Sequence, residues 1–315
     1  MKTVLWMVVL GACLGLATGA SALPLLVDEN FSYTAGDSVA AHGWIGHSYS
    51  NPNNTIYVTS PGLSYAGYPS SGNGNAASLV SSGEDVHLNF TAQTSGTVYC
   101  AFLANFSAAN TAGDYFIHFG KNAWTTDYYA RVFCKRDASN KLAFGLTKYN
   151  ETPVTYTAFS YDLGTTYLVV VAYTFNTGST TDDSMSLWVN PVCDPQPSAQ
   201  LTVTATSKTD ATNIGGVALR QGTAANASTE KVDGIRVGTT WSDAVCGAAA
   251  TGACCAADGT CSVQTQAVCL AAGGAYRGDG TNCSPNPCPQ PGACCALDGT
   301  CTFVLATNCT GVWNG

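Results

Sequence analysis

Charged side chains are scarce in this sequence. Of its 315 residues, 12 are Lys or Arg and 20 are Asp or Glu, which gives a formal net charge of −8. The few cations are scattered, so the chain lacks the basic patch through which proteins bind nucleic acid. The acidic balance also argues against anionic membrane surfaces as partners.

Long hydrophobic runs are absent beyond the N-terminal segment. There, Lys2 precedes an apolar run at residues 4–16, and the small residues Ala20, Ser21 and Ala22 follow it. This pattern predicts a signal peptide over residues 1–22. The run is too short to span a bilayer, which takes about 20 residues. We therefore expect a secreted, extracellular chain, free or attached to a cell surface, without membrane insertion.

Amphipathic helix patterns are lacking from residue 25 to residue 241. The apolar residues instead form short runs between clusters of Gly, Ser, Asn, Asp and Thr, and the run at 166–175 (TYLVVVAYTF) is the most apolar. Many short strands with turn residues between them are typical of a sandwich or barrel. The prolines of PVCDPQPS interrupt the pattern as an internal loop. We expect one all-β domain over residues 23–246.

Cysteine is sparse in this domain and dense in the tail. After a linker at residues 247–251, GACCAADGTC begins at Gly252 and GACCALDGTC begins at Gly292. These copies define two repeats, at residues 252–291 and 292–315. The second repeat stops before the positions of its last two cysteines, so we expect the sequence to be cut within a repeat.

Secretion and a high density of cysteine together predict disulfides. Adjacent cysteines in both repeats also differ from the C-x-x-C knuckles of zinc sites. Cys100 and Cys134 can be bridged if their strands are neighbours, and Cys193 and Cys246 then remain as the pair outside the repeats. The other expected disulfide cysteines lie in the repeats, and the sequence does not choose their pairing: Cys254, Cys255, Cys261, Cys269, Cys283, Cys288, Cys294, Cys295, Cys301 and Cys309.

Several phrases give the domain a family likeness. They are NFSYTAGDSVAAHGW (30–44), SPGLSYAGYPSSGNGNAASL (60–79), SGEDV (82–86), DSMSLWVNP (183–191) and VDGIRVGTTW (232–241). With them the domain resembles bacterial secreted proteins with a laminin G-like or concanavalin A-like jelly roll, and the tail resembles GACC-type repeats of large extracellular bacterial proteins. The resemblance implies two antiparallel sheets packed face to face. Members of that superfamily bind glycans or proteins, hydrolyse polysaccharides or act as spacers, so the fold does not decide the function.

Glutamate is scarce, which weighs against glycoside hydrolysis. The glucanases of this superfamily use a Glu-x-Asp-x-(x)-Glu pattern for acid and nucleophile, and the sequence lacks it. It also lacks a Gly-x-Ser-x-Gly elbow, and its four histidines (His42, His47, His87 and His118) have no zinc-type spacing. We therefore expect a non-catalytic protein that binds a glycan or a matrix or surface protein, or serves as a structural module. The alternatives are a polysaccharide-active hydrolase and a self-assembling surface or filament protein.

Aromatic residues in polar loops are the candidates for glycan binding, because sugar rings pack their apolar faces on them. They are Trp44, Tyr49, Tyr65, Tyr68 and Trp124. The resemblance further implies that such a jelly roll can carry one structural calcium, with Asp28 and Asp233 in the matching places. Asp182 and Asp183 are a second candidate calcium site, since calcium takes oxygen ligands in loops. We expect no other cofactor.

Overall fold

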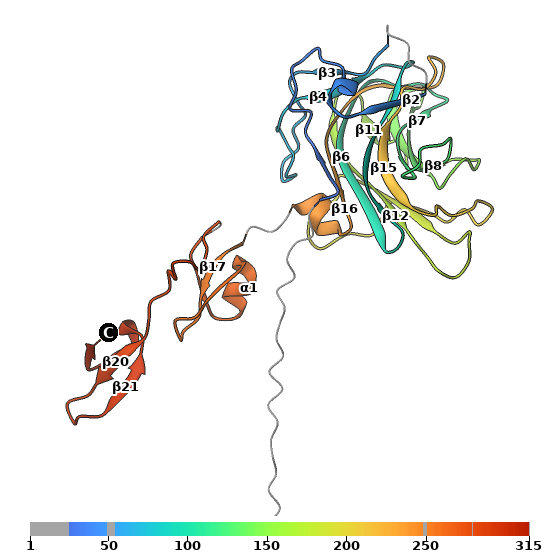
Figure 1. Cartoon of the computed structure of the whole chain (residues 1–315). Coiled ribbons are helices and arrows are strands. Elements are labelled where there is room, and N and C mark those ends of the chain that lie inside the picture. Colours follow the sequence, from blue (N-terminus) through green and yellow to red (C-terminus); the bar gives the residue numbers. More distant parts are fainter. Residues whose placement is uncertain (1–24, 49–53, 248–250, 279, 315) are drawn as a thin grey trace, which may run out of the picture. The chain divides into compact units, whose positions relative to one another are not determined.

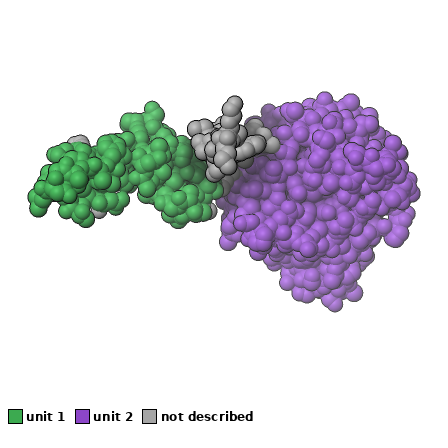
Figure 2. Space-filling view, turned by 90° about the horizontal axis from the view of Figure 1, so that it is seen from below, with its two compact units in different colours: residues 1–22, 249–315 green, residues 23–248 purple. Residues whose placement is uncertain are grey.

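The computed structural model describes residues 25–48, 54–247, 251–278 and 280–314. The expected signal peptide at residues 1–22 lies outside the described residues, as does Tyr49. The chain divides into a larger compact unit, residues 23–248, and a smaller unit that includes residues 249–315; Figure 2 colours them separately. No helix in the described part of the chain is long and apolar enough to cross a membrane.

The larger unit is an antiparallel two-sheet sandwich, which confirms the predicted all-β jelly-roll class (Figure 1). Sheet A has the order β14 (Leu201–Val203), β13 (Ser184–Val189), β12 (Thr166–Thr174), β6 (Thr97–Ala108), β16 (Thr229–Gly238), β4 (Ala76–Leu79) and β3 (Tyr57–Thr59), and β1 (Val27–Glu29) pairs with β16. Sheet B has the order β10 (Thr155–Tyr156), β9 (Lys141–Thr147), β8 (Tyr128–Arg136), β7 (Asp114–Gly120), β15 (Ile214–Leu219), β5 (Asp85–Gln93) and β2 (Ile45–Ser48), and β11 (Tyr161–Asp162) pairs with β9. A short helical turn, η1 (Val39–His42), precedes β2.

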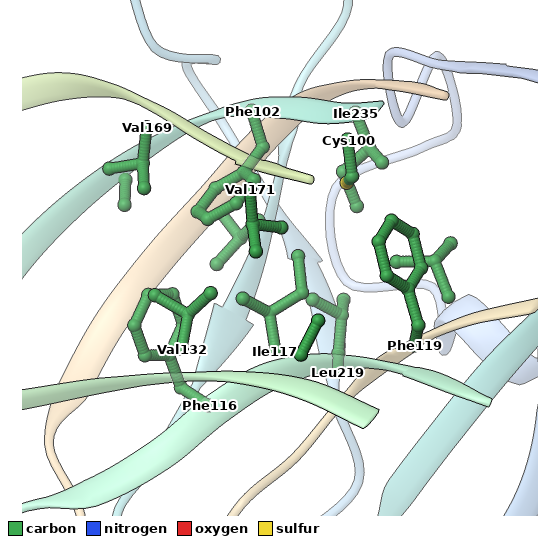
Figure 3. Close-up of a cluster of buried hydrophobic side chains, with 14 of the residues drawn as sticks. Cys100, Phe102, Phe116, Ile117, Phe119, Val132, Val169, Val171, Leu219 and Ile235 are labelled. Carbon is green, nitrogen blue, oxygen red and sulfur yellow. The ribbon is translucent and has the colours of Figure 1, made fainter. Parts of the chain in front are cut away.

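The core lies between the inner faces of the two sheets. Alternation along each strand sends every second side chain inward, and Figure 3 shows side chains such as Phe102 and Val171 of sheet A facing Phe116 and Ile117 of sheet B. Phe116 makes edge-to-face contacts with Phe102 and Phe106, at centroid distances of 6.0 and 5.2 Å. Such aromatic contacts between the two sheets fix the distance between them.

The outer face of sheet A is covered by a second apolar cluster. Val170 and Trp188 on this face pack with Trp241 and Tyr68, which come from loops and from the segment before η2 (Ser242–Cys246). The Trp188 and Trp241 rings lie 5.0 Å apart. This cover places the free, polar face of the sandwich on sheet B.

The smaller unit contains two cysteine-rich modules with the same strand arrangement. In the first, β17 (Thr251–Cys255) lies between β18 (Cys261–Thr265) and β19 (Ala275–Tyr276), with α1 (Gln266–Ala271) between β18 and β19 in the sequence. In the second, β20 (Gly292–Cys295) lies between β21 (Cys301–Val304) and β22 (Val312–Asn314), with a short turn, η3 (Ala306–Asn308).

Six disulfides join described cysteines. Their pairs are Cys193–Cys246 in the larger unit, Cys254–Cys269, Cys255–Cys288 and Cys261–Cys283 in the first module, and Cys294–Cys309 and Cys295–Cys301 in the second. This number of disulfides indicates an oxidising, extracellular environment.

The expected Cys100–Cys134 bridge is not formed, and both thiols are free and buried. Cys100 lies on β6 of sheet A and Cys134 on β8 of sheet B. The expectation assumed that their strands were neighbours, whereas the strands belong to facing sheets. Both side chains therefore fill the core as small apolar groups.

Candidate functional site

The outer face of sheet B places side chains from distant segments in rows across the strands. In one row, Ala218 of β15 pairs with His87 of β5 on one side and with His118 of β7 on the other. In the next row, Gly216 pairs with Asn89 and Gly120, and Gly120 pairs with Tyr128 of β8. We call this area the sheet B site; it comprises His47, Asp85, His87, Tyr115, His118, Trp124, Tyr128, Arg131 and Arg220.

Two glycines make a flat floor for the indole of Trp124. A Cβ atom on Gly120 would lie 2.5 Å from the Trp124 ring, and one on Gly216 would lie 2.7 Å from it. These contacts are too short for any side chain other than hydrogen, so the ring lies directly on the backbone. The indole Nε1–H also donates a 2.7 Å hydrogen bond to Oδ1 of Asn89. The floor and the hydrogen bond together hold Trp124 beside the histidines.

An irregularity in β8 brings Tyr128 and Arg131 to the same face, although they are an odd number of positions apart in the strand. The pairing between β7 and β8 shifts near this point, and Ala130 has a left-handed φ of 48°. That region is unfavourable for a residue with a Cβ atom. The backbone strain is the structural cost of presenting both side chains in the sheet B site.

Three imidazoles meet at the centre of the site. Nδ1 of His47 lies 3.1 Å from Nδ1 of His87, and the His47 and His118 rings lie 6.2 Å apart. Trp124 lies 4.0 Å from the His87 ring centre, and Tyr128 lies 4.3 Å from that of His118. Burial lowers the pKa of His47 and of His87 to about 4, and it lowers the pKa of His118 well below its ordinary value. All three rings are therefore neutral at neutral pH.

Two of these imidazoles keep a nitrogen without a hydrogen-bond partner. Nε2 of His47 and Nε2 of His118 are buried and have no hydrogen-bond partner among the residues that the structure describes. In His118, Nδ1 contacts the backbone oxygen of Phe119 at 3.0 Å, and a carbonyl only accepts, so Nδ1 carries the proton. The neutral ring then has a bare lone pair at Nε2. Unsatisfied buried acceptors are rare in folded proteins and often mark functional groups.

Two guanidinium groups lie on the Tyr115 ring. Cζ of Arg220 is 4.0 Å from the ring centre and Cζ of Arg131 is 4.7 Å from it. Arg220 forms an ion pair with Asp114 at 2.9 Å and lies 3.8 Å from Asp85. Arg131 differs, because in the described part of the chain no carboxylate oxygen lies within 4.0 Å of its nitrogen atoms. It is a half-buried cation with its charge available to a ligand.

A cavity of about 280 Å³ adjoins the site and is lined by Asp85, Arg220 and Gln221, among others. Burial raises the pKa of Asp85 to about 6, although hydrogen bonds from Ser48 and the Gln221 backbone and the charge of Arg220 act to lower it. Ser48 donates to Asp85 at 2.5 Å. Asp85 therefore titrates in the range where a carboxyl group can donate a proton.

The predicted aromatic platform is mostly structural. Trp44 is 2% exposed, stacks on Phe31 and donates to Glu29, so it belongs to the core. Tyr68 is also buried, and its hydroxyl donates to backbone oxygens. Tyr65 packs against the cluster outside sheet A. Of the described candidates, Trp124 alone lies in the sheet B site.

The carboxylates predicted to bind calcium lie in two places. Asp28 contacts Arg236 at 3.4 Å, and the buried Asp233 accepts from the backbone of Leu63 and Gly234, each at 2.6 Å. These contacts occupy both carboxylates with partners from the protein. A structural calcium between them stays a prediction.

The second pair of predicted calcium ligands has a third carboxylate beside it. Asp182 and Asp183 lie with Asp210, and one ligand atom from each falls within 4.8 Å of the others. The ammonium group of the buried Lys148 already pairs with Asp210. The donor types suit calcium, while Lys148 supplies part of the charge that a cation would bring. Calcium at this place also stays a prediction.

Most of the sheet B site was missed in the sequence. The histidines are judged in the sequence by metal-ligand spacing alone, which does not separate His42 from the others; His42 lies outside the site, where it contacts Asp37 at 2.9 Å and stacks on Tyr33. One usable signal was the alternation in DVHLNF, which places Asp85, His87 and Asn89 on one strand face. Polar residues at every second position predict an exposed strand face, but they do not show which residues from other segments lie beside it.

No protein-family model matches the chain, and no curated protein matches its sequence. Solved structures that match include the marine PL-14 alginate lyase from Aplysia kurodai, at 10% identity and a TM-score of 0.47, over 69% of this chain and 100% of that chain. The alginate lyase Aly36B matches at 15% identity and a TM-score of 0.45, over 69% and 97%. A β-1,3-glucanase from Mycobacterium marinum matches at 11% identity and a TM-score of 0.40, over 69% and 100%.

The expectation of a non-catalytic binding or structural protein is corrected at this point, and with it the expectation that the chain is not an enzyme. The solved structures named above are polysaccharide-active enzymes. Their low identities and TM-scores assign no activity, so any specific reaction has to rest on this chain's own residues. The error has a chemical reason: the absent glucanase pattern excludes one route of hydrolysis, whereas other cleavage of a glycan does not need that pair of carboxylates.

Proposed function

We propose that the sheet B site cleaves a polysaccharide containing uronate sugars by β-elimination. The observation that carries the proposal is the proximity of neutral imidazoles, a tyrosine and a guanidinium on the outer face of sheet B, where the guanidinium has no carboxylate partner among the described residues. An extracellular glycan is then the partner of this chain. The alginate lyases and the glucanase among the similar structures agree with a glycan substrate, although their similarity is too low to argue for it.

Elimination from a uronate needs a base and an acid, and it needs no water. A base removes the proton from the carbon beside the carboxylate, and the electron pair of that C–H bond forms a carbon–carbon double bond. The bond from the next carbon to the glycosidic oxygen breaks, and the departing oxygen takes a proton from an acid. Negative charge develops on the carboxylate during the first step, so a fixed cation beside it lowers the barrier.

The residues of the site match these three tasks. Arg131 lies within reach of the outer face with its charge unpaired, and we assign it to the substrate carboxylate. The unpartnered Nε2 atoms of His118 and His47 are the two candidate bases, since burial keeps both rings neutral at neutral pH and therefore able to take the substrate's proton during the reaction. Burial raises the pKa of Tyr128, so its phenol stays protonated and is the proposed acid for the departing oxygen.

Trp124 is the proposed contact for a sugar ring. It is half-buried, with one face on the glycine floor, and it lies next to His87 and Tyr128. Because His87 and His118 beside it are almost fully buried, we propose that residues 121–127 move when substrate enters. Enclosure of the imidazoles until that moment keeps them dry and neutral.

Hydrolysis is the second candidate, and Asp85 supports it. Its pKa of about 6 suits a general acid, and Asp114 lies on the other side of Arg220 as a second carboxylate. Two carboxyl groups flanking a bond are the usual machinery of glycosidases. The ion pair that Asp114 already makes with Arg220 weighs against this reading.

One experiment separates the two reactions. The full chain is incubated with a panel of polyuronates and with a neutral β-glucan, in water enriched in a heavy oxygen isotope. Elimination predicts products that absorb ultraviolet light through the new double bond and carry no solvent oxygen. Hydrolysis predicts the reverse on both counts. A chain that shortens none of these polymers, under conditions where it is folded, would refute the proposed function.

A further inference from the structure

We infer that Phe133, Tyr156 and Lys135 form an additional subsite for a carboxylate-bearing sugar, next to the sheet B site and on its β8–β10 side. This inference rests on the proposed function, since it describes how a longer stretch of the same polymer is held. It goes beyond that function by assigning residues that make no part of the proposed chemistry. It also predicts that the chain recognises several sugar units at once.

The aromatic part of the subsite continues a row of the sheet B site. Tyr115 of β7 pairs with Phe133 of β8, Phe133 pairs with Gly145 of β9, and Gly145 pairs with Tyr156 of β10. The Phe133 ring lies 5.4 Å from that of Tyr115 and 6.4 Å from that of Tyr156. The half-buried rings thus extend from the guanidinium groups across the outer strands.

Gly145 gives Tyr156 the same kind of floor that Gly120 and Gly216 give Trp124. A Cβ atom on Gly145 would lie 2.6 Å from the Tyr156 ring. The ring therefore lies with one face on bare backbone, and the ammonium group of Lys135 lies over the ring. Because two aromatic rings on this face are held in the same way, we take the Tyr156 position as a built part of the surface.

The charge of the subsite comes from Lys135. Its Nζ lies 3.8 Å from the Tyr156 ring centre and 5.4 Å from that of Phe159, which is 41% exposed. No carboxylate oxygen in the described ranges lies within 4.0 Å of this ammonium group. Lys135 and Arg131 are thus two unpaired cations on the outer face of β8, in a chain whose formal net charge is −8.

An anionic sugar fits this combination better than other ligands. The apolar face of a sugar ring packs on the partly exposed rings of Phe133 and Phe159, and its carboxylate pairs with the ammonium group that lies on Tyr156. A neutral sugar leaves the charge of Lys135 unused, and an acidic peptide leaves the flat aromatic row unused. Continuity with the proposed cleavage site then identifies the occupant as another unit of the same uronate polymer.

The test measures binding and cleavage separately. Oligouronates of increasing length are titrated against the full chain carrying His47→Asn and His118→Asn, which removes both candidate bases so that the ligand survives the measurement. Addition of Lys135→Gln is expected to weaken binding of the long oligouronates by about three- to fivefold, as for a partly exposed ion pair. Tyr156→Ala is expected to weaken it by about tenfold. The shortest oligouronates, which do not reach this row, are expected to bind unchanged.

A matched control is Lys231→Gln, which removes a half-buried lysine of β16 in the other sheet. A neutral oligosaccharide series shows whether the charge matters. The inference is overturned if Lys135→Gln leaves every affinity unchanged, if it weakens short and long oligouronates equally, or if no oligouronate binds. These outcomes are separable from a failure of the proposed function: an unmodified chain that yields no unsaturated product refutes elimination, whereas length-dependent binding that requires Lys135 still supports the subsite.

Discussion

The two sheets of the sandwich have similar inner faces and opposite outer faces. Outside sheet A, Val170 and Trp188 are covered by Trp241 and Tyr68, so this face is a second core. Outside sheet B, strands of the same kind present imidazoles, guanidinium groups and open aromatic rings. Strand pairing and core packing thus specify the sandwich, while the side chains at the alternate positions decide whether an outer face is covered by apolar residues or presents polar and aromatic groups.

The two outer faces also differ in how completely their polar atoms are hydrogen-bonded. Tyr68 and Trp241 donate hydrogen bonds to backbone oxygens in the cover of sheet A. The sheet B site leaves Nε2 of His47 and of His118 without partners and strains the backbone at Ala130. Residues on the outside of sheet A should therefore affect stability, and residues on the outside of sheet B should affect activity.

Loss of activity should be greatest when the unpaired cation of the sheet B site is removed. Arg131→Ala is expected to lower kcat on a polyuronate by about 10³-fold, as removal of a preorganised charge-stabilising donor does. The midpoint of thermal unfolding should fall only through the lost packing of the guanidinium on the Tyr115 ring, because Arg131 pairs with no carboxylate among the described residues. Arg131→Lys is the matched control and should retain part of the activity. Equal losses of activity and stability in Arg131→Ala would contradict the assigned role.

A loss of stability without a loss of activity is expected for the outer face of sheet A. Trp188→Ala is expected to lower the free energy of unfolding by about 3 kcal/mol, the usual cost of truncating a buried aromatic side chain. The cleavage rate per folded molecule should stay as in the unmodified chain. Denaturant titration gives the first quantity and initial rates give the second. A Trp188→Ala chain that is stable yet inactive would reverse the division between the faces.

A fall in pH should lower the free energy of unfolding through the buried His87 of the sheet B site. The folded pKa of His87 is lowered by burial to about 4, against an ordinary value of 6.5, so the unfolded chain binds the proton first. Stability from this group is present above pH 6.5 and is lost as the pH falls toward 4, at about 1 kcal/mol per pH unit. Unfolding curves between pH 7 and pH 4 measure the slope, and His87→Gln should flatten it. An unchanged slope in that variant would assign the acid sensitivity to other groups.

The smallest expected effect concerns the Trp124 ring. Trp124→Phe keeps an aromatic ring on the glycine floor and loses the hydrogen bond to Asn89, so KM should rise by less than about tenfold. Gly216→Ala is the contrasting variant, because its methyl group would occupy the place of the ring. Initial rates at varied substrate concentration should show the larger rise in KM for Gly216→Ala. A larger effect of Trp124→Phe would mean that the hydrogen bond, and not the floor, positions the ring.

The sequence was sufficient for the fold class because its signals are local. Runs such as residues 166–175 alternate with turn residues, and strand β12 lies there at Thr166–Thr174. The expected pairing of Cys193 with Cys246 is formed, although it was inferred as the pair left over by a Cys100–Cys134 bridge that is not formed. The fold class, in contrast, needs only neighbours in the sequence.

The sheet B site could not be found in the same way because it depends on register. His87 and His118 meet only because both pair with Ala218, which lies about a hundred residues further along the chain. Trp44 and Trp124 both follow glycine-rich or polar segments, yet one is core and the other lies on the outer face. The bulge at Ala130 changes which residues of β8 face outward, and no residue preference in the sequence predicts this bulge.

The paired glycines under Trp124 have a consequence for how this surface can change over time. The proposed recognition surface is flat because Gly120 and Gly216 carry no side chains. Its shape is therefore set by the backbone, and each of these two positions accepts glycine alone. The ring above it is free to be exchanged for another flat group without any rearrangement of the strands. Ligand preference can therefore drift through the residues that lie on the floor, while Gly120 and Gly216 are constrained by the absence of any tolerable alternative.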